Sequence, residues 1–205
     1  MGRARRHDEA TAIALLDAAE AILAADGLEG LTVRRVADQV GTTTRAVYSS
    51  LGSKEALLAG LATRAFDLLG ARVAALPRSD DPAADLIAAG TIGFREWALE
   101  HPALFRVGFL QQALVPRDAW SRSGTSAERA LGALQELIRR MEKDGGLGGR
   151  TVEDATWQFD SLCEGLAVTD LRGGTPCPGD DSKPVWADAL GALIAGWRVR
   201  PKADH

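Results

Sequence analysis

The stretch "VGTTTRAVYSSLGSKEALL", residues 40–58, decides the fold and raises the first question about function. It places three threonines, an arginine and a tyrosine between two helical patterns, where a purely structural loop would favour glycine, asparagine or proline. Thr43 follows a glycine turn and is placed to cap a short helix. The apolar residues of that helix should point inward and its polar residues outward. The outward set is Thr44, Arg45, Tyr48 and Ser49.

The residues before this stretch predict two more helices. Apolar side chains recur at intervals of three and four residues from Ala12 to Leu23, and Gly27 follows where a left-handed C-terminal cap would lie. Thr32 can cap the next helix, which is short and which Gly41 ends. Two short helices joined by a turn with glycine form a helix-turn-helix.

The residues after this stretch predict a long helix and then a helical body. The long helix runs from Ser53 to Leu76, and Pro77 ends it. At 1.5 Å per residue it spans about 35 Å, enough to join a small N-terminal domain to a separate body. Turn-forming segments, "SRSGTS", "DGGLGGR" and "RGGTPCPGDDSKP", separate the later helical patterns. Those patterns cover about residues 82–100, 103–113, 126–143, 152–171 and 185–199, so we expect an all-α fold of about nine helices.

Composition and charge limit the classes of function. The chain has 205 residues, a net charge of −4 and no apolar run near the ~20 residues of a membrane span, so we expect a soluble, cytoplasmic protein without membrane partners. Residues 1–54 carry seven basic and seven acidic groups, but the basic ones cluster. Arg3, Arg5 and Arg6 form a basic N-terminal arm, which is sufficient for local contact with phosphates.

The reactive side chains predict neither an enzyme nor a metal site. Cys163 and Cys177 form no CxxC pair, and the three histidines lie far apart. We find no paired acid and base, no activated nucleophile motif and no phosphate-binding glycine loop, and we expect no cofactor. Cys163 is best interpreted as a small buried group, and His101 as a residue at a helix end.

Two parts of the sequence resemble a known family. "LTVRRVADQVGTTTRAVYSSLGSKEALL" resembles the DNA-binding segment of TetR family transcriptional regulators, although Thr42, Ser50 and Leu51 replace the more common apolar residue, histidine or tyrosine, and phenylalanine. "WALEHPALFRVGF" and "FDSLCEGLAVTDLRGG" resemble the middle and penultimate helices of one branch, which often has tryptophan and histidine where this chain has Asp160 and Glu164.

The chemistry of the short helix supports DNA recognition. The guanidinium of Arg45 can give two hydrogen bonds to the O6 and N7 atoms of guanine, whereas hydroxyls and the ammonium group of Lys54 are better suited to phosphates. Each residue alone is more simply explained as a cap, a solvated charge or packing; together they occupy one exposed face. The predicted DNA contacts are Thr32, Thr43, Thr44, Arg45, Tyr48, Ser49 and Lys54, in a DNA-binding domain of residues 1–52.

The remaining residues, 53–205, are expected to form a domain for ligand binding and dimerisation, as the resemblance implies. Aromatic residues at helical spacing are usually core packing, but they can also line an apolar pocket. The candidate ligand contacts are Phe94, Trp97, Phe105, Phe109, Trp157 and Phe159. A stripe of small residues in the last helix and the apolar face of residues 152–171 suggest a homodimer interface. Its candidate residues are Phe159, Leu166, Ala187, Gly191 and Ala195.

The sequence therefore predicts a ligand-responsive transcriptional regulator of TetR type. We expect a repressor that binds a palindromic double-stranded DNA operator as a homodimer and is released by a small apolar or aromatic effector. The alternative is a helical small-molecule carrier or enzyme with an incidental helix-turn-helix. Salt-dependent binding to a DNA duplex would distinguish the two.

Overall fold

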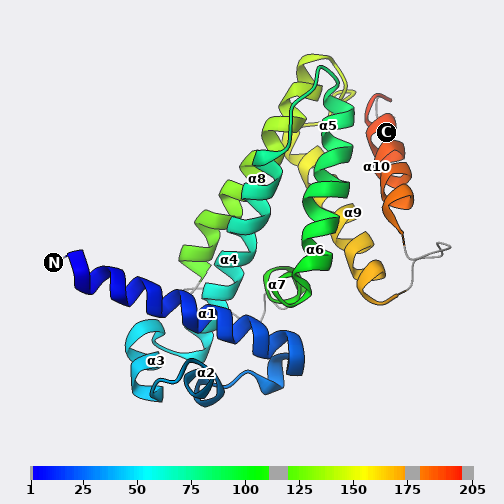
Figure 1. Ribbon diagram of the computed structural model, residues 1–205. Helices are drawn as coiled ribbons and strands as arrows, with labels where there is room; N and C mark the ends of the chain where they lie inside the picture. The colour runs from blue at the N-terminus through cyan, green and yellow to red at the C-terminus, as the bar shows by residue number, and fades with distance from the viewer. Residues whose placement is uncertain (1, 111–119, 174–180, 200–205) are drawn as a thin grey trace, which may run out of the picture. The chain divides into compact units, whose positions relative to one another are not determined.

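The computed structural model describes the backbone of residues 2–110, 120–173 and 181–199. All regular structure in these ranges is helical, and α5, η1 and α6 follow one another without a break, as do α7 and η2 (Figure 1). The described residues therefore form nine continuous helices, which confirms the predicted all-α fold. The elements are α1 Gly2–Gly30, α2 Val33–Val40, α3 Thr44–Leu51, α4 Lys54–Ala75, α5 Pro82–Ala88, η1 Ala89–Arg95, α6 Glu96–Glu100, α7 Pro102–Phe105, η2 Arg106–Leu110, α8 Trp120–Lys143, α9 Val152–Leu171 and α10 Lys183–Trp197.

The two short helices start at the predicted threonine caps. The Thr32 hydroxyl accepts a hydrogen bond from the backbone N–H of Arg35 at 3.3 Å, and the Thr43 hydroxyl accepts one from Ala46 at 3.2 Å. Gly41, between the two helices, has a φ of 72°, a left-handed conformation that residues with a Cβ rarely adopt. These local signals set where the two short helices start and where the first of them ends.

The contacts divide the chain into two compact units. The first unit contains residues 1–66 and 102–126, and the second contains residues 67–101 and 127–205. Helix α4 runs from the first unit into the second. This division by packing differs from the expected division by role at residue 52, because the start of α4 packs with the helix-turn-helix.

In the first unit, α1 packs against α2, α3 and α7. Its buried face carries Leu15, Ala19 and Ile22. Gly27 has a φ of 67°, which interrupts the helical backbone where the sequence predicts a cap. The segment with the three arginines of the predicted arm forms the first turns of α1, and those side chains lie outside the described set.

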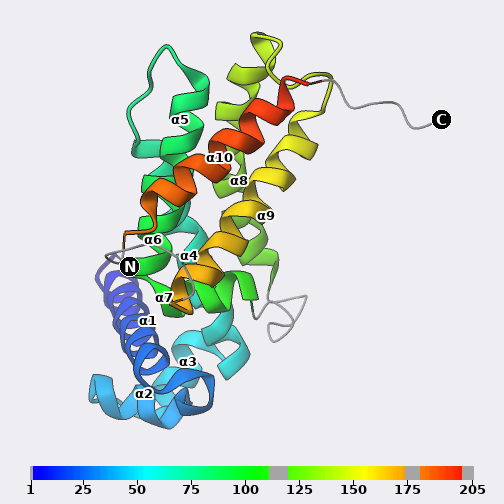
Figure 2. The same cartoon turned by 90° about the vertical axis from the view of Figure 1, so that its right-hand side faces the viewer.

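In the second unit, η1 lies at the centre and contacts α5, α6, α9 and α10 (Figure 2). Gly90 in η1 allows a close approach that a larger residue would prevent. A Cβ at this position would lie 2.3 Å from Cδ1 of Leu190 and 3.3 Å from Cζ of Phe159. The missing side chain thus lets η1 pack against α9 and α10 at once.

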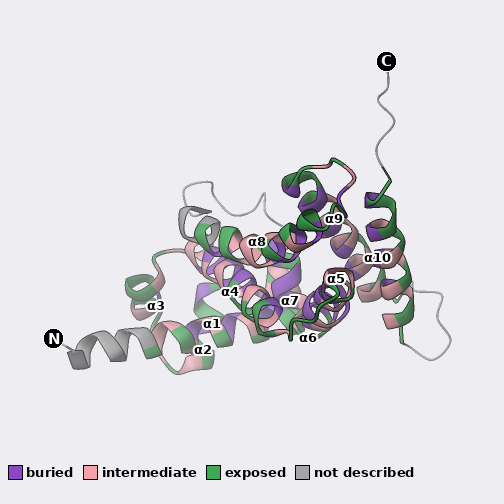
Figure 3. Ribbon diagram, turned by 90° about the horizontal axis from the view of Figure 1, so that it is seen from above, coloured by how far each residue is buried: buried purple, intermediate pink, exposed green. Residues whose placement is uncertain are grey.

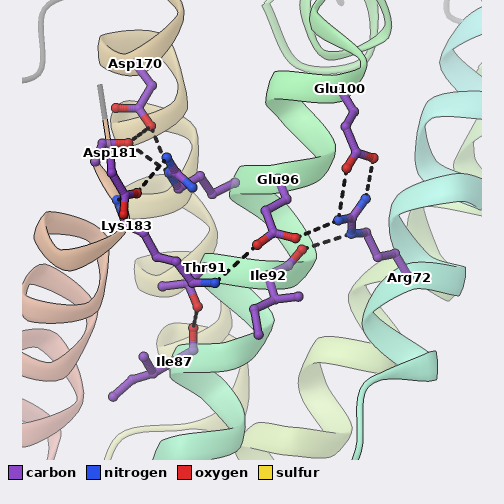
Figure 4. A network of polar contacts seen from close by, with 11 residues as sticks. Arg72, Ile87, Thr91, Ile92, Glu96, Glu100, Asp170, Asp181 and Lys183 are labelled. Carbon is purple, nitrogen blue, oxygen red and sulfur yellow. Dashed lines mark hydrogen bonds and ion pairs between the residues drawn. The ribbon is translucent and has the colours of Figure 1, made fainter. Parts of the chain in front are cut away.

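A buried polar network also links these helices (Figure 4). The Arg95 guanidinium donates to the Ser182 hydroxyl at 2.8 Å and lies 3.3 Å from the carboxylate of Asp170. Beside it, Glu96 pairs with Arg72 at 2.9 Å (Figure 4). The network thus joins η1, α9 and the start of α10. Because Arg95 and Asp170 neutralise each other, burying them costs less free energy than burying either charge alone.

Two differences from the predicted helices have local causes. Helix α8 starts at Trp120, so the predicted break at "SRSGTS" is wrong: isolated serine and glycine are tolerated inside a helix that packing supports. The predicted break at 144–150 is confirmed, and positive φ angles at Gly145, Gly148 and Gly149 explain it. In the described part of the chain, no helix combines the length and apolar character needed to cross a bilayer.

Candidate DNA-binding interface

The short helix α3 presents a polar face to solvent. Thr44, Arg45, Tyr48 and Ser49 are exposed, and Tyr48 has 54% of its surface accessible. Val47, on the opposite face, is buried against the rest of the first unit. The inward and outward pattern predicted from the sequence is therefore confirmed.

Several polar groups on this face have no partner within the protein. In the described part of the chain, the Arg45 guanidinium, the Tyr48 hydroxyl and the Thr44 hydroxyl form no hydrogen bond or ion pair. The Ser49 hydroxyl, in contrast, donates to the backbone carbonyl of Arg45 at 2.9 Å. Arg45 and Tyr48 are therefore free to bind an external partner, while Ser49 already uses its proton inside the helix.

The other predicted contacts lie at helix starts. Thr32 and Thr43 are exposed, but their hydroxyls already accept the N-cap hydrogen bonds of α2 and α3. Lys54, the first residue of α4, is half-buried, and its ammonium group lies 3.5 Å from the carbonyl of Leu28. Since that bond is long, it restrains the ammonium group only weakly.

Two arginines in α2 differ in how strongly they are bound within the protein, and so in whether they can contact an external partner. Arg35 is bound to the Asp26 carboxylate and to the Gly30 carbonyl, so it fastens α2 to the end of α1. Arg34 is largely exposed and lies 4.0 Å from Asp38, the outer limit of an ion pair. Arg34 was not among the contacts predicted from the sequence; its position two residues after the Thr32 cap was the available signal.

The comparisons with known proteins agree with this geometry. The family model for bacterial regulatory proteins of the tetR family matches residues 15–61, and the model for the tetracyclin repressor-like C-terminal domain matches residues 87–193. The chain belongs to the TetR family. It is a DNA-binding transcriptional regulator, in a family of regulators rather than enzymes. No curated protein sequence matches it.

Solved structures of TetR regulators share this fold. A regulatory protein of the family from Rhodococcus RHA1 has a TM-score of 0.71 and 20% identity, over 91% of this chain and 96% of that one. The regulator PfmR from Thermus thermophilus has a TM-score of 0.66 and 20% identity, with coverage of 89% and 97%. A family member from Marinobacter aquaeolei has a TM-score of 0.64 and 19% identity, with coverage of 92% and 97%.

The aromatic residues predicted to bind a ligand belong to both units. In the second unit, Phe94 and Trp97 are buried with ring centroids 6.1 Å apart, and Phe159 is also buried. Phe105 and Phe109 belong to the first unit, where their rings stack at 5.3 Å. Trp157 has 73% of its surface exposed and therefore contributes to no interior cluster.

A hollow of about 250 Å³ lies in the first unit, beside the end of α3. None of the predicted ligand contacts lines it. Its walls come from α1, α3 and α4, with Leu51 at the end of α3. The lining residues are Leu16, Ser50, Leu51, Ala56, Ala59, Gly60 and Thr63.

The predicted dimer residues vary in their accessibility within one chain. Phe159 is buried, Leu166, Ala187 and Gly191 are half-buried, and only Ala195 is exposed. A Cβ at Gly191 would lie 3.9 Å from Cδ1 of Ile87, which is ordinary contact with α5 of the same chain. Part of the small-residue stripe in α10 thus already packs internally.

Helix α9 also carries an unusual acidic pair, which stands out in the sequence only as a departure from one branch of the family. Asp160 and Glu164 are half-buried and lie one turn apart. Burial raises the pKa of Asp160 to about 6, and burial together with the charge of Asp160 raises the pKa of Glu164 to about 7. Cys163 between them is fully buried, as predicted, and burial raises its pKa as well.

The described residues contain no group of three or more histidines, cysteines or carboxylates placed to hold a metal ion. His101 caps the end of α6, in agreement with the helix-end interpretation. Cys177, in the connection between α9 and α10, lies outside the described residues.

Proposed function

We propose that this TetR regulator is a repressor that binds a palindromic operator as a homodimer and is released by a small apolar or aromatic effector. The observation that carries the proposal is the exposed face of α3, where Arg45 and Tyr48 have no partner in the described part of the protein. A helix of this kind, after a glycine turn, fits the major groove with its first residues on the base edges.

Arg45 is the proposed base reader. It is the second residue of α3, and its guanidinium is exposed and unpaired in the described chain. A guanidinium forms two parallel hydrogen bonds with guanine, a pairing that contributes about 1–3 kcal/mol of discrimination against other bases. Thr44 and Ser49 lie on the same face and complete the proposed contact with base edges.

Phosphates are the proposed partners of the remaining residues. The Tyr48 hydroxyl can donate to a phosphate oxygen, and the weakly held ammonium group of Lys54 can approach the backbone as a charge. Thr32 and Thr43 keep their capping bonds and can still donate a hydroxyl proton to an oxygen. These contacts set the position of α3 without reading sequence.

The effector and the dimer belong to the proposed domain of residues 53–205. The buried rings of Phe94, Trp97 and Phe159 supply the apolar surface that an aromatic effector would need in the second unit. A dimer is required because one short helix reads too few base pairs for a specific site. As a regulator of DNA, the protein is proposed to act in the cytoplasm.

The test is a comparison of two substitutions on two DNAs. The operator is a duplex that the native protein selects from a random pool, and the control duplex is a scrambled version of it. Arg45→Ala should weaken operator binding about 10- to 100-fold per contacted half-site and relax the preference at one base pair, because the bidentate donor is lost. Lys54→Ala should weaken both duplexes equally and lower the salt slope by about one counterion per contact.

Arg139→Ala is the matched control, because Arg139 is an exposed arginine on α8, in the second unit. It should leave both affinities unchanged. If Arg45→Ala weakens the operator and the scrambled duplex by the same factor, Arg45 holds a phosphate and the base reader is another residue. If the native protein selects no duplex at all, the proposed operator function fails.

A further inference from the structure

The hollow of about 250 Å³ in the first unit lies behind the exposed face of α3. Ser50 and Leu51 line it from α3, Leu16 lines it from α1, and the first turns of α4 supply the rest of the described wall. At about 100° per residue, Leu51 lies about 40° around the helix from the buried Val47, whereas Arg45 lies about 160° from it. The hollow therefore faces away from the side of α3 that is proposed to contact DNA.

Helix α3 has little support within the unit. Among its eight residues, all of them described, Val47 alone is buried, and most of the others are exposed (Figure 3). The helix packs mainly against α1 and α2, and Leu51, beside the hollow, is half-buried. A void next to a side chain removes the van der Waals contacts on that side. A molecule in the hollow would therefore add contacts between α3 and the walls formed by α1 and α4.

The size and charge of the hollow restrict what it can bind. None of the seven described lining residues carries a charge, so a charged ligand would lose its hydration without gaining a partner. An apolar cavity of about 150 Å³ is large enough to hold benzene. A volume of about 250 Å³ thus fits one ring with a short substituent. A rigid ring also loses less conformational freedom on binding than a flexible chain of the same size.

Hydroxyl groups on the wall can bind one polar substituent of such a ligand. Ser50 is exposed, so it lies at the mouth of the hollow, and its hydroxyl forms no hydrogen bond in the described part of the chain. The Thr63 hydroxyl donates to the backbone carbonyl of Ala59 at 2.8 Å, so its oxygen can still act as an acceptor. Leu16, Leu51 and the buried Ala59 make the rest of the wall apolar. The arrangement suits a ring inside and a hydroxyl group at the mouth.

We infer that this hollow binds a neutral aromatic alcohol with one ring, and that the bound molecule holds α3 in place. The site is separate from the effector site proposed in the second unit. The alcohol and the operator bind together, because the hollow and the proposed DNA contacts lie on opposite sides of α3. A helix that is already held loses less freedom on binding DNA, so occupation of the hollow strengthens operator binding instead of releasing the protein.

The first experiment measures binding to the hollow by amide NMR of the full chain. The probe is 2-phenylethanol, and the control ligand is phenylacetate, which has a similar size but a negative charge. The probe should shift the amide signals of Ser50, Leu51, Gly60 and Thr63 with a Kd below about 1 mM, and phenylacetate should leave them in place. Ser50→Ala should weaken binding of the probe about fivefold, which is the usual effect of losing one hydrogen bond.

Two variants fill the hollow from different helices. Leu51→Phe acts from α3 and Ala56→Leu acts from α4, so one can replace the other if circular dichroism shows that either fails to fold. Both should abolish the shifts caused by the probe. Leu68→Phe is the matched control, because it adds the same atoms as Leu51→Phe at an exposed position outside the hollow, and it should bind the probe normally. A native protein that shows no shifts overturns the site, and shifts that both filling variants retain overturn its location.

The second experiment measures operator affinity by fluorescence anisotropy, with and without saturating 2-phenylethanol. The quantity compared is the change in affinity for the native protein relative to the change for Leu51→Phe, because any effect of the probe through the second unit is common to both. The native change should exceed that of Leu51→Phe by at least about threefold. The operator should in turn strengthen binding of the probe to the hollow by the same factor, because coupling is reciprocal. Equal changes, or a lower affinity in the native protein, overturn the support of α3.

The two experiments separate this inference from the proposed function, since the inference uses operator binding but neither the proposed effector site nor the homodimer. If the operator is bound and the probe leaves the signals of the hollow unchanged, only the inference fails. If the native protein selects no operator, the proposed function fails, while the NMR titration still decides whether the hollow is a binding site.

Discussion

At the scale of single residues, Leu51 shows how one side chain affects the packing of α3 against α1 and α4. It is half-buried at the end of α3 and lines the hollow of about 250 Å³ in the first unit. In the resemblance found from the sequence, phenylalanine is common at this position. The leucine side chain is smaller than phenylalanine. It packs partly into the first unit but leaves the space beside it unfilled.

Leu51→Phe should therefore stabilise the protein. The larger ring can occupy the hollow between α1, α3 and α4, and filling such space typically contributes about 0.5–2 kcal/mol to the free energy of unfolding. Urea unfolding monitored by circular dichroism measures the change. The control is Leu68→Phe, which adds the same atoms at a more exposed position on α4 that does not line the hollow, and it should have little effect.

An unchanged or lower stability of Leu51→Phe would mean that the hollow cannot accept the ring without displacing α3. Binding of the variant to operator DNA then becomes informative, because a displaced α3 would also weaken recognition.

Single residues also mark the limits of sequence interpretation. The exposure of Arg45 and Tyr48 was predictable, because the period of a short helix fixes which side chains face outward. The raised pKa values of Asp160 and Glu164 were not, because they depend on burial by helices distant in sequence. The exposure of Trp157 was likewise missed, since composition alone assigns a tryptophan to the interior.

At the scale of elements, local signals predicted most helices. Helix α9 starts and ends at the predicted residues because the Thr151 cap and the turn after Leu171 are encoded locally. The division of the Pro82–Glu100 helix into α5, η1 and α6 was not predicted, because a π-helical segment has no composition of its own. Its packing depends on Leu190 of α10, about one hundred residues further along the chain.

Gly90→Ala should show what this packing contributes. The added Cβ would lie 2.3 Å from Cδ1 of Leu190 and close to the ring of Phe159, so α10 or η1 must shift. Such overpacking typically costs about 1–3 kcal/mol. Gly132→Ala in α8 is the control: a Cβ there meets nothing within 4 Å, and alanine favours a helix, so this variant should be as stable as the native protein or more so.

Urea unfolding of both variants provides the measurement. Equal stability of Gly90→Ala and the native protein would mean that Leu190 rearranges without cost, and that η1 is not held by this contact. Because Gly90 and α3 belong to different units, operator affinity at low urea should remain native in either case.

At the scale of the whole molecule, the two proposed functions differ in how far sequence can predict them. The DNA-binding face lies on one short helix, so its residues are neighbours in sequence and their arrangement follows from helical geometry. An effector site must be assembled from several helices. The six predicted aromatic contacts in fact divide between two units and the surface, which no periodicity in the sequence could show.

Helix α4 follows the helix-turn-helix directly and connects the two proposed functions. Its first part packs in the unit that holds the helix-turn-helix, and its second part belongs to the unit that holds Phe94 and Trp97. The proposed effector binding in the second unit can therefore act on DNA binding by moving α4, provided that the helix transmits the movement without bending. A 100-fold loss of operator affinity requires about 2.7 kcal/mol of coupling, which is within the usual range for allosteric proteins.

The last prediction tests this rigidity. Ala71 and Ala74 are exposed in the second part of α4, so Ala71→Gly with Ala74→Gly removes no buried contact but weakens the helix by about 1 kcal/mol per residue. We expect operator affinity without effector, and effector affinity without DNA, to stay within about threefold of native. The loss of operator affinity at saturating effector should fall from about 100-fold to less than about 10-fold, because a softened helix absorbs the movement. The effector is an aromatic molecule chosen by thermal shift, and fluorescence anisotropy measures DNA binding. Ala21→Gly with Ala24→Gly makes the same change at exposed positions of α1 and should leave the coupling native. If softened α4 transmits the full native effect, the coupling runs through other elements.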